Sequence, residues 1–261
     1  MRTPLTTLAL AAVLPLSPLL AVNETEAVTT ADLSFAPTDS ARPKPPRVEP
    51  LPASALLERA QAPAGAVILF NGQGLDSWSN PTWKTTADYI EIFSSKKKPG
   101  LTTRESFGSC RLHLEWWSPP GLPPEKSSQK RSNSGVFLMG RYEVQILDSL
   151  DSSTYADGMA GAVYGQFPPL ANALRPAGEW QYYDITFHRP IFDAQGKLVR
   201  AARLTVDLNG VRVQNNVQLT GPTGFKKRPP YVAHADRLPL TLQDHGDLLR
   251  YRNIWVVPIA D

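Results

Sequence analysis

The most informative segment of the sequence covers residues 133–148 and reads N-S-G-V-F-L-M-G-R-Y-E-V-Q-I-L-D. Its first three residues are a turn signal, and the apolar run from Val136 to Met139 is broken by Gly140. Strict alternation follows, and successive side chains of a strand point to opposite faces. The pattern therefore predicts a strand with two different faces. One face carries Tyr142, Val144 and Ile146, and the other carries Arg141, Glu143 and Gln145.

The meaning of this polar row depends on what surrounds it. A row of Arg, Glu and Gln is ordinary on a strand face that meets water. The same row is a sugar-binding or catalytic row if the face is concave and walled by aromatic side chains. The stretch itself leaves both interpretations open.

Alternation of the same kind recurs along the chain after residue 64. It predicts strands over residues 66–70, 89–93, 110–117, 181–187, 204–208, 211–213 and 254–257. Asn209 and Gly210 form the pair preferred in two-residue hairpin turns, because both positions tolerate a positive φ. No 3.6-residue period is sustained beyond residue 64. Many short alternating strands predict an all-β fold, an antiparallel β-sandwich or jelly roll.

The N-terminal quarter of the 261 residues has a different composition. Residues 1–27 combine Arg2 with an apolar stretch and small residues, which is typical of a signal peptide. Residues 28–63 are rich in proline and predict a disordered, extended linker without a core of its own. The folded domain is expected to span residues 64–261. We therefore expect a secreted or periplasmic protein that has no membrane segment once the signal is removed.

Charge and cysteine content exclude several classes of function. The net charge is only +3, and the basic clusters at residues 96–98 and 226–228 resemble solvated loops. A nucleic-acid partner is therefore not expected. Cys110 is the only cysteine and cannot form an internal disulfide. The chain also has no P-loop, dinucleotide fingerprint, cysteine-rich zinc pattern or nucleophile elbow.

Three polar clusters are candidates for chemistry. They are Arg141, Glu143 and Gln145 followed by Asp148; Gln243, Asp244, His245 and Gly246; and His113, Glu115 and Trp117. Two carboxylates at a set separation would suit hydrolysis of a glycosidic bond. A histidine with carboxylates would equally suit proton abstraction or a metal site. Spacing does not show whether His245 meets Glu143. Asp244 to Gly246 also fits a plain turn, in which Asp accepts backbone hydrogen bonds.

The order of the motifs along the chain carries more information than their spacing. The motifs are L-F-N-G at 69–72, L-E-W at 114–116, N-S-G-V-F-L at 133–138, Y-E-V-Q-I-L-D at 142–148, G-A-V-Y-G at 161–165, G-E-W at 178–180, N-G at 209–210, G-P-T-G at 221–224, L-Q-D-H-G at 242–246 and R-N-I at 252–254. This order closely resembles the 3-keto-disaccharide hydrolase family, whose fold is a concanavalin-like jelly roll. The resemblance covers nearly all of residues 64–258.

The resemblance implies a carbohydrate substrate, a disaccharide or glycoside already oxidised to a ketone at sugar carbon 3. A base would remove the hydrogen on carbon 2, the group on carbon 1 would leave, and water would add back. Glu143 and His245 would act as base or as ligands of a divalent metal ion, and Asp148 or Asp244 would orient them. The residues expected to bind sugar are Arg141, Gln145, Tyr164, Trp117, Gln243 and Asp244.

Two other functions fit the same sequence, and one loop differs from the pattern of the family. The same jelly roll serves lectins, so a non-catalytic, secreted carbohydrate-binding domain is the main alternative. An ordinary glycosidase would have to draw its carboxylates from Glu115, Glu143 and Asp148. The loop over residues 119–131 is longer and more basic than the short Pro-Gly connection expected there, and would alter which leaving group fits if it borders the cleft.

Overall fold

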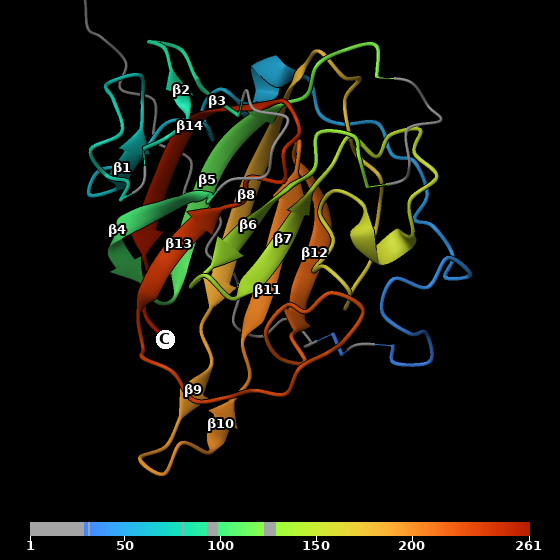
Figure 1. Ribbon diagram of the computed structural model, residues 1–261, viewed down its shortest axis with the longest axis vertical. Coiled ribbons are helices and arrows are strands. Elements are labelled where there is room, and N and C mark those ends of the chain that lie inside the picture. The colour runs from blue at the N-terminus through green and yellow to red at the C-terminus, as the bar shows by residue number, and fades with distance from the viewer. Residues whose placement is uncertain (1–28, 31, 80, 93–98, 123–128) are drawn as a thin grey trace, which may run out of the picture.

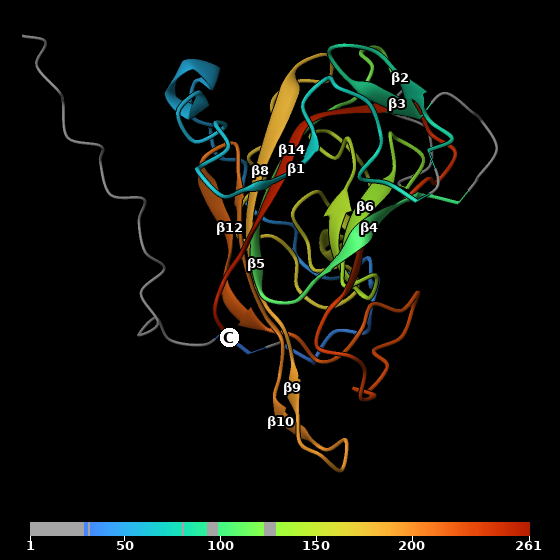
Figure 2. The ribbon, with the colours of Figure 1, turned by 90° about the vertical axis from the view of Figure 1, so that its left-hand side faces the viewer.

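Two antiparallel sheets pack face to face in the computed structural model, which describes residues 29–261 except 31, 80, 93–98 and 123–128 (Figures 1 and 2). The large sheet has the order β12-β11-β8-β5-β14-β3-β2, with β1 also paired to β14. Its strands are β1 (Val67–Phe70), β2 (Lys84–Thr85), β3 (Ile90–Ile92), β5 (Cys110–Trp117), β8 (Trp180–His188), β11 (Arg203–Leu208), β12 (Val211–Gln218) and β14 (Leu249–Pro258). This arrangement confirms the predicted antiparallel β-sandwich.

The small sheet contains most of residues 133–148. Its order is β4-β13-β6-β7, and its strands are β4 (Leu101–Phe107), β6 (Ser134–Leu138), β7 (Tyr142–Ile146) and β13 (Leu238–Leu242). A separate hairpin of β9 (Ile191–Phe192) and β10 (Leu198–Arg200) projects from one end of the sandwich (Figure 2). Short 3₁₀ turns occur at η1 (Ala53–Leu56) and η2 (Ala156–Gly158). No helix among the described residues is long and apolar enough to cross a membrane.

The predicted alternation decides which side chains fill the space between the sheets. Tyr142, Val144 and Ile146 are fully buried members of the core, as are Val136 and Leu138 on the neighbouring strand. The opposite row of β7 faces away from the core. The interpretation as a two-faced strand is therefore confirmed for residues 142–146, whereas Arg141 lies in the turn before β7.

Two tight turns set the register of the strands. Asn209 and Gly210 have φ values of 51° and 80° and join β11 to β12, as predicted. Met139 and Gly140 have φ values of 54° and 63° and lie in the three-residue turn, 139–141, that joins β6 to β7. A positive φ is uncommon for methionine. Met139 is held there by burial of its side chain in the core.

Strand β13 was not predicted from the sequence, because Pro239 lies inside it and proline is rare in central strands. The structure places Pro239 where β13 pairs with β4 alone. Pairing with β6 is confined to Thr241 and Leu242, and the register with β4 shifts between residues 239 and 241. The missing N–H of proline therefore costs this sheet no ladder bond to β6.

The proline-rich segment differs from the disordered linker that we expected. Leu56, in η1, is buried against Tyr182 on the outer face of the large sheet. The carbonyl of Ala60 accepts hydrogen bonds from Trp255 Nε1 and Asn253 Nδ2, at 3.1 and 2.8 Å. Proline prevents regular structure but leaves carbonyls and side chains free to dock, so the described part of 28–63 is extended and packed. The predicted signal at 1–27 lies outside the described residues.

Candidate active site

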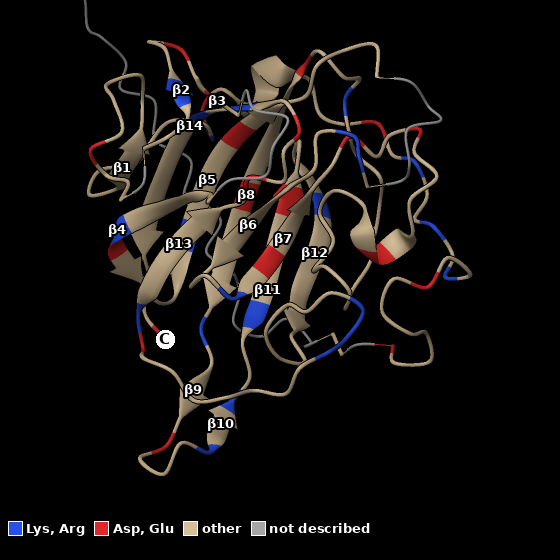
Figure 3. Cartoon of the chain, in the orientation of Figure 1, with Lys and Arg blue, Asp and Glu red and all other residues tan. Residues whose placement is uncertain are grey.

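Glu143 lies on the outer face of the small sheet, yet its side chain is only 5% exposed. It is the only charged residue within β6, β7 and β13 (Figure 3). The carboxylate lies over Gly135 of β6, and a Cβ built on Gly135 would collide with Oε1 of Glu143. Gly135 therefore leaves room for the carboxylate in its present position, which gives the N-S-G motif a physical reason.

Gln145 lies beside Glu143 on the same face and is also buried. One terminal atom of its amide lies 3.1 Å from Oε1 of Glu143, and the other lies 3.1 Å from Oε1 of Gln129. Turning the amide nitrogen toward Glu143 gives the carboxylate a hydrogen-bond donor. The two residues that alternation predicted to project together are thus in contact.

The loop that precedes β6 packs beside Glu143 and Gln145. Gln129 Nε2 donates to the carbonyl of Gly158 at 3.0 Å, and Asn133 Nδ2 donates to the carbonyl of Gln129 at 2.9 Å. These neutral amides bridge the loop to η2. The surroundings of Glu143 are therefore rich in amide groups that suit sugar hydroxyls. Residues 123–128 of the unusually long loop lie outside the described residues.

Two tyrosines form a wall beside Glu143. The hydroxyls of Tyr155 and Tyr164 lie 2.6 Å apart, and Tyr164 N donates to the carbonyl of Glu143 at 3.3 Å. Burial raises the pKa of Tyr164, and the nearby negative charge of Glu143 raises it further. Burial and its hydrogen bond to Tyr164 likewise raise the pKa of Tyr155. Both phenols are therefore protonated at neutral pH. One O–H is used within the pair, which leaves the other proton for a substrate oxygen.

An aromatic ring lies on the same sheet face and was not singled out from the sequence. Phe137 of β6 is directly opposite Glu143 of β7 and is half-buried, outside the core cluster. Within the apolar run 136–139 it resembles a core residue. Its register opposite Glu143 is the signal that would have placed it on the polar face.

The Q-D-H-G motif forms a turn at the end of β13. Gly246 N donates to Asp244 Oδ1 at 2.9 Å with Gly246 at a φ of 88°, which is the turn geometry considered above. Gln243 N donates to the carbonyl of Gly135 at 2.9 Å, so Gln243 lies across Gly135 from Gln145. Asp244 is buried, whereas His245 is exposed at the same end of the sheet.

Asp148 is engaged in a buried ion pair instead of lying beside Glu143. Its Oδ2 accepts from Arg131 at 2.6 Å, and Arg131 also donates to the carbonyl of Asp148 at 3.1 Å. Burial raises the pKa of Asp148, although the charge of Arg131 opposes this. The pair ties the loop before β6 to the end of β7. This contact indicates a structural role.

Trp117, Glu115 and His113 lie on the outer face of the large sheet, on the other side of the sandwich from Glu143. Trp117 stacks on the guanidinium of Arg250 at 4.3 Å. Glu115 accepts from Arg252 at 2.6 Å, and His113 pairs with Asp184 at 2.7 Å. Trp117 is therefore not brought together with the other sugar-binding candidates. Glu115 and Glu143 cannot flank one glycosidic bond.

Arg141 lies at the rim of a shallow hollow of about 410 Å³ on the small sheet. The hollow is lined by Thr102, Met139, Gly140, Arg141, Leu238, Pro239 and Thr241. Arg141 is exposed and is the only charged residue in this lining. It lies in the turn immediately before β7, outside the strand that carries Glu143.

The residues around Glu143 do not provide the donor set of a divalent-metal site. Within the described ranges, no three His, Cys, Asp or Glu side chains gather closely enough to hold an ion. Glu143 is surrounded by amides and phenols, while His245 is on an exposed turn.

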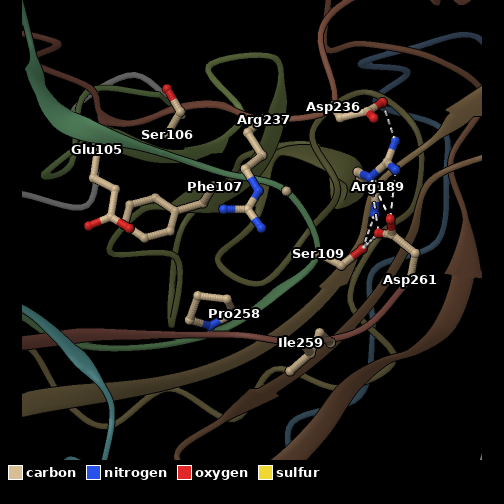
Figure 4. Close-up of a pocket in the computed structure, with 11 residues that line it drawn as sticks. Glu105, Ser106, Phe107, Ser109, Arg189, Asp236, Arg237, Pro258, Ile259 and Asp261 are labelled. Carbon is tan, nitrogen blue, oxygen red and sulfur yellow. Dashed lines mark hydrogen bonds and ion pairs between the residues drawn. The ribbon is translucent and has the colours of Figure 1, made fainter.

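A second hollow, of about 240 Å³, lies where β4 turns into β5 (Figure 4). Arg189 lies in its lining, where it is paired with Asp236 and Asp261, each at 2.6 Å. Ser109 Oγ donates to Asp261 at 2.6 Å. The charge of Arg189 is thus already balanced, and the cluster joins the β4–β5 turn to the end of β8.

Fold and site together define a jelly-roll β-sandwich with a buried polar cluster around Glu143 on its small sheet. The chain belongs to the family of the 3-keto-alpha-glucoside-1,2-lyase-like domain, whose sequence model matches residues 65–257. None of the curated proteins compared with it matches.

Solved structures from Parabacteroides distasonis share this fold. One, described as a candidate glycosyl hydrolase, is 34% identical, with a TM-score of 0.71 over 84% of this chain and 93% of that one. Another candidate glycosyl hydrolase from the same organism is 20% identical, with a TM-score of 0.55 over 74% of this chain and 99% of that one. The second similarity concerns the fold alone.

Proposed function

We propose that the protein is a glycoside-cleaving hydrolase that acts on 3-keto-disaccharides or other 3-keto-glycosides. The observation that carries the proposal is the carboxylate of Glu143, buried over Gly135 and flanked by two protonated tyrosines. Membership of the 3-keto-glucoside family and the similarity to candidate glycosyl hydrolases support a carbohydrate substrate.

Glu143 is suited to be the base. A ketone at carbon 3 makes the hydrogen on carbon 2 acidic, and the Glu143 carboxylate accepts that proton as the enediolate forms. The phenol O–H left over in the tyrosine pair donates to the developing oxyanion. The ketone then re-forms as the electrons make a double bond between carbons 1 and 2, the bond from carbon 1 to the leaving oxygen breaks, and that oxygen takes the proton held by Glu143. Water adds at carbon 1 and a proton at carbon 2, so the sum is hydrolysis.

His245 and Asp244 have lesser roles in this proposal. The turn carrying them joins the site through Gln243 and Gly135, and the exposed imidazole of His245 is placed to exchange protons with solvent. Gln145 and Gln243 hold sugar hydroxyls from the two sides of Gly135.

The test is incubation with a 3-keto-disaccharide and with the same disaccharide unoxidised, in deuterated water. We expect cleavage of the 3-keto-disaccharide alone, with deuterium incorporated at carbon 2. Glu143→Gln should retain the fold and lose at least about 10²-fold in kcat. Glycan binding without any product would favour the lectin-like alternative. Full turnover by Glu143→Gln would remove Glu143 from the mechanism.

A further inference from the structure

The geometry points to a leaving-group subsite that runs across the small sheet, from Phe137 into the hollow rimmed by Arg141. This inference rests on the proposed function. It concerns the part of the substrate that lies beyond the residues around Glu143. It predicts a leaving group that is itself a sugar ring, larger than a simple alkyl group.

The first step is the direction in which a substrate can extend. β7 is the edge strand of the small sheet, and its free side is closed by the loops carrying Val163 and Thr223. Tyr155 and Tyr164 stand on that same side. A sugar whose carbon 2 lies against Glu143 therefore has its free path on the other side, over β6 and β13.

The second step is the row of side chains along that path. Glu143 is directly opposite Phe137, Phe137 is opposite Thr241, and Thr241 is opposite Thr102. All belong to the face opposite the core, so they form one straight row across four strands. Exposure increases along it, since Glu143 is buried while Phe137, Thr241 and Thr102 are partly exposed.

The third step is the chemistry of the row. A half-exposed ring provides a flat apolar platform on which the face of a sugar ring can stack. Beyond it, the hydroxyls of Thr102 and Thr241 lie 3.2 Å apart and can each bond a sugar hydroxyl. The guanidinium of Arg141 adds several donors at the rim of the hollow.

The test compares two substrates that share one 3-keto-glucosyl group, a 3-keto-disaccharide and methyl 3-keto-glucoside. Phe137→Ala should lower kcat/KM about tenfold for the disaccharide and less than about twofold for the methyl glycoside. Phe137→Tyr should restore the loss, and Val199→Ala on the projecting hairpin should change neither rate. Thermal unfolding checks that each variant is folded.

An equal loss on both substrates, or no loss on either, would overturn the subsite. If the wild type cleaves neither substrate, the proposed function fails separately. The subsite is then judged by calorimetric binding of the unoxidised disaccharide, which Phe137→Ala should weaken about tenfold. Equal binding by the variant and the wild type would overturn it.

Discussion

The carboxylate of Glu143 occupies the space that a Cβ on Gly135 would need. The two residues are on neighbouring strands, and Gly135 is the residue opposite Gln145. The glycine thus lets a charged side chain lie flat on the sheet, where loops can cover it. The relationship links a motif in the sequence to the burial of the proposed base.

This relationship predicts a coupled effect of two substitutions. Gly135→Ala should displace Glu143, destabilise the protein by about 1–3 kcal/mol and abolish turnover. In a Glu143→Ala background the same substitution should cost little, because the colliding carboxylate is absent. Urea unfolding of the four proteins measures the coupling. Equal costs in both backgrounds would show that the collision does not decide the role of Gly135.

The tyrosine pair predicts a loss of rate without a loss of binding. Tyr155→Phe and Tyr164→Phe should each lower kcat by about 10²-fold, because the phenol that donates to the oxyanion is removed or left without its partner. KM should change much less. Tyr89→Phe, on the large sheet, is the matched control and should behave like the wild type. A change confined to KM would assign the pair to ground-state binding.

The buried pair of Arg131 and Asp148 predicts a strong effect on stability. Arg131→Met should lower the free energy of unfolding by about 3–5 kcal/mol, because it leaves the Asp148 carboxylate buried without its partner. The double variant with Asp148→Leu should recover most of this loss. Arg47→Met, which breaks an exposed pair with Asp151, is the control and should have little effect. Chemical denaturation distinguishes these outcomes.

The outer-face histidine predicts a pH dependence of stability. Burial alone would lower the pKa of His113, but hydrogen bonds to Asp184 and Glu115 outweigh it and raise the pKa above its ordinary value. The folded pKa therefore exceeds the unfolded value of about 6.5. The resulting stabilisation is fully present below that unfolded value and is lost as the pH rises through the folded pKa.

The measurement is the free energy of unfolding of the wild type and of His113→Gln across this range. The advantage of the wild type should be greatest in mild acid and should decline toward alkaline pH. Asp184, Glu115 and Asn253 contact the ring, Arg252 pairs with Glu115, and all four are unchanged in the variant. An advantage that grows as the pH rises would contradict the raised pKa.

Local patterns predicted a large part of the fold. The alternation in 142–146 assigned core and polar faces correctly, and the Asn209–Gly210 turn joined the strands where expected. Both features depend only on side-chain period and on the φ that each residue tolerates. β13 was missed because the effect of Pro239 depends on which neighbour it pairs with, which no local pattern contains.

The candidate site was only partly predictable for a related reason. Glu143 and Gln145 share a strand face, so alternation grouped them correctly, whereas Arg141 lies in the turn before the strand. Trp117 alternates just as regularly, yet it lies on the outer face of the large sheet, on the opposite side of the sandwich from Glu143. Alternation predicts which residues of one strand share a face. It does not predict on which side of the sandwich that face lies. The partner of Asp148 likewise depended on a loop conformation.

The proline-rich segment has a consequence for the boundaries of the folding unit. Arg42 lies 3.7 Å from Asp157, and Thr38 N donates to the same carboxylate at 3.0 Å. Asp157 lies two residues after Tyr155, so the segment ahead of the family domain braces the loop that carries the tyrosine pair. An expressed fragment that begins at residue 64 would therefore match the family in sequence and still lack part of the support of its own active site.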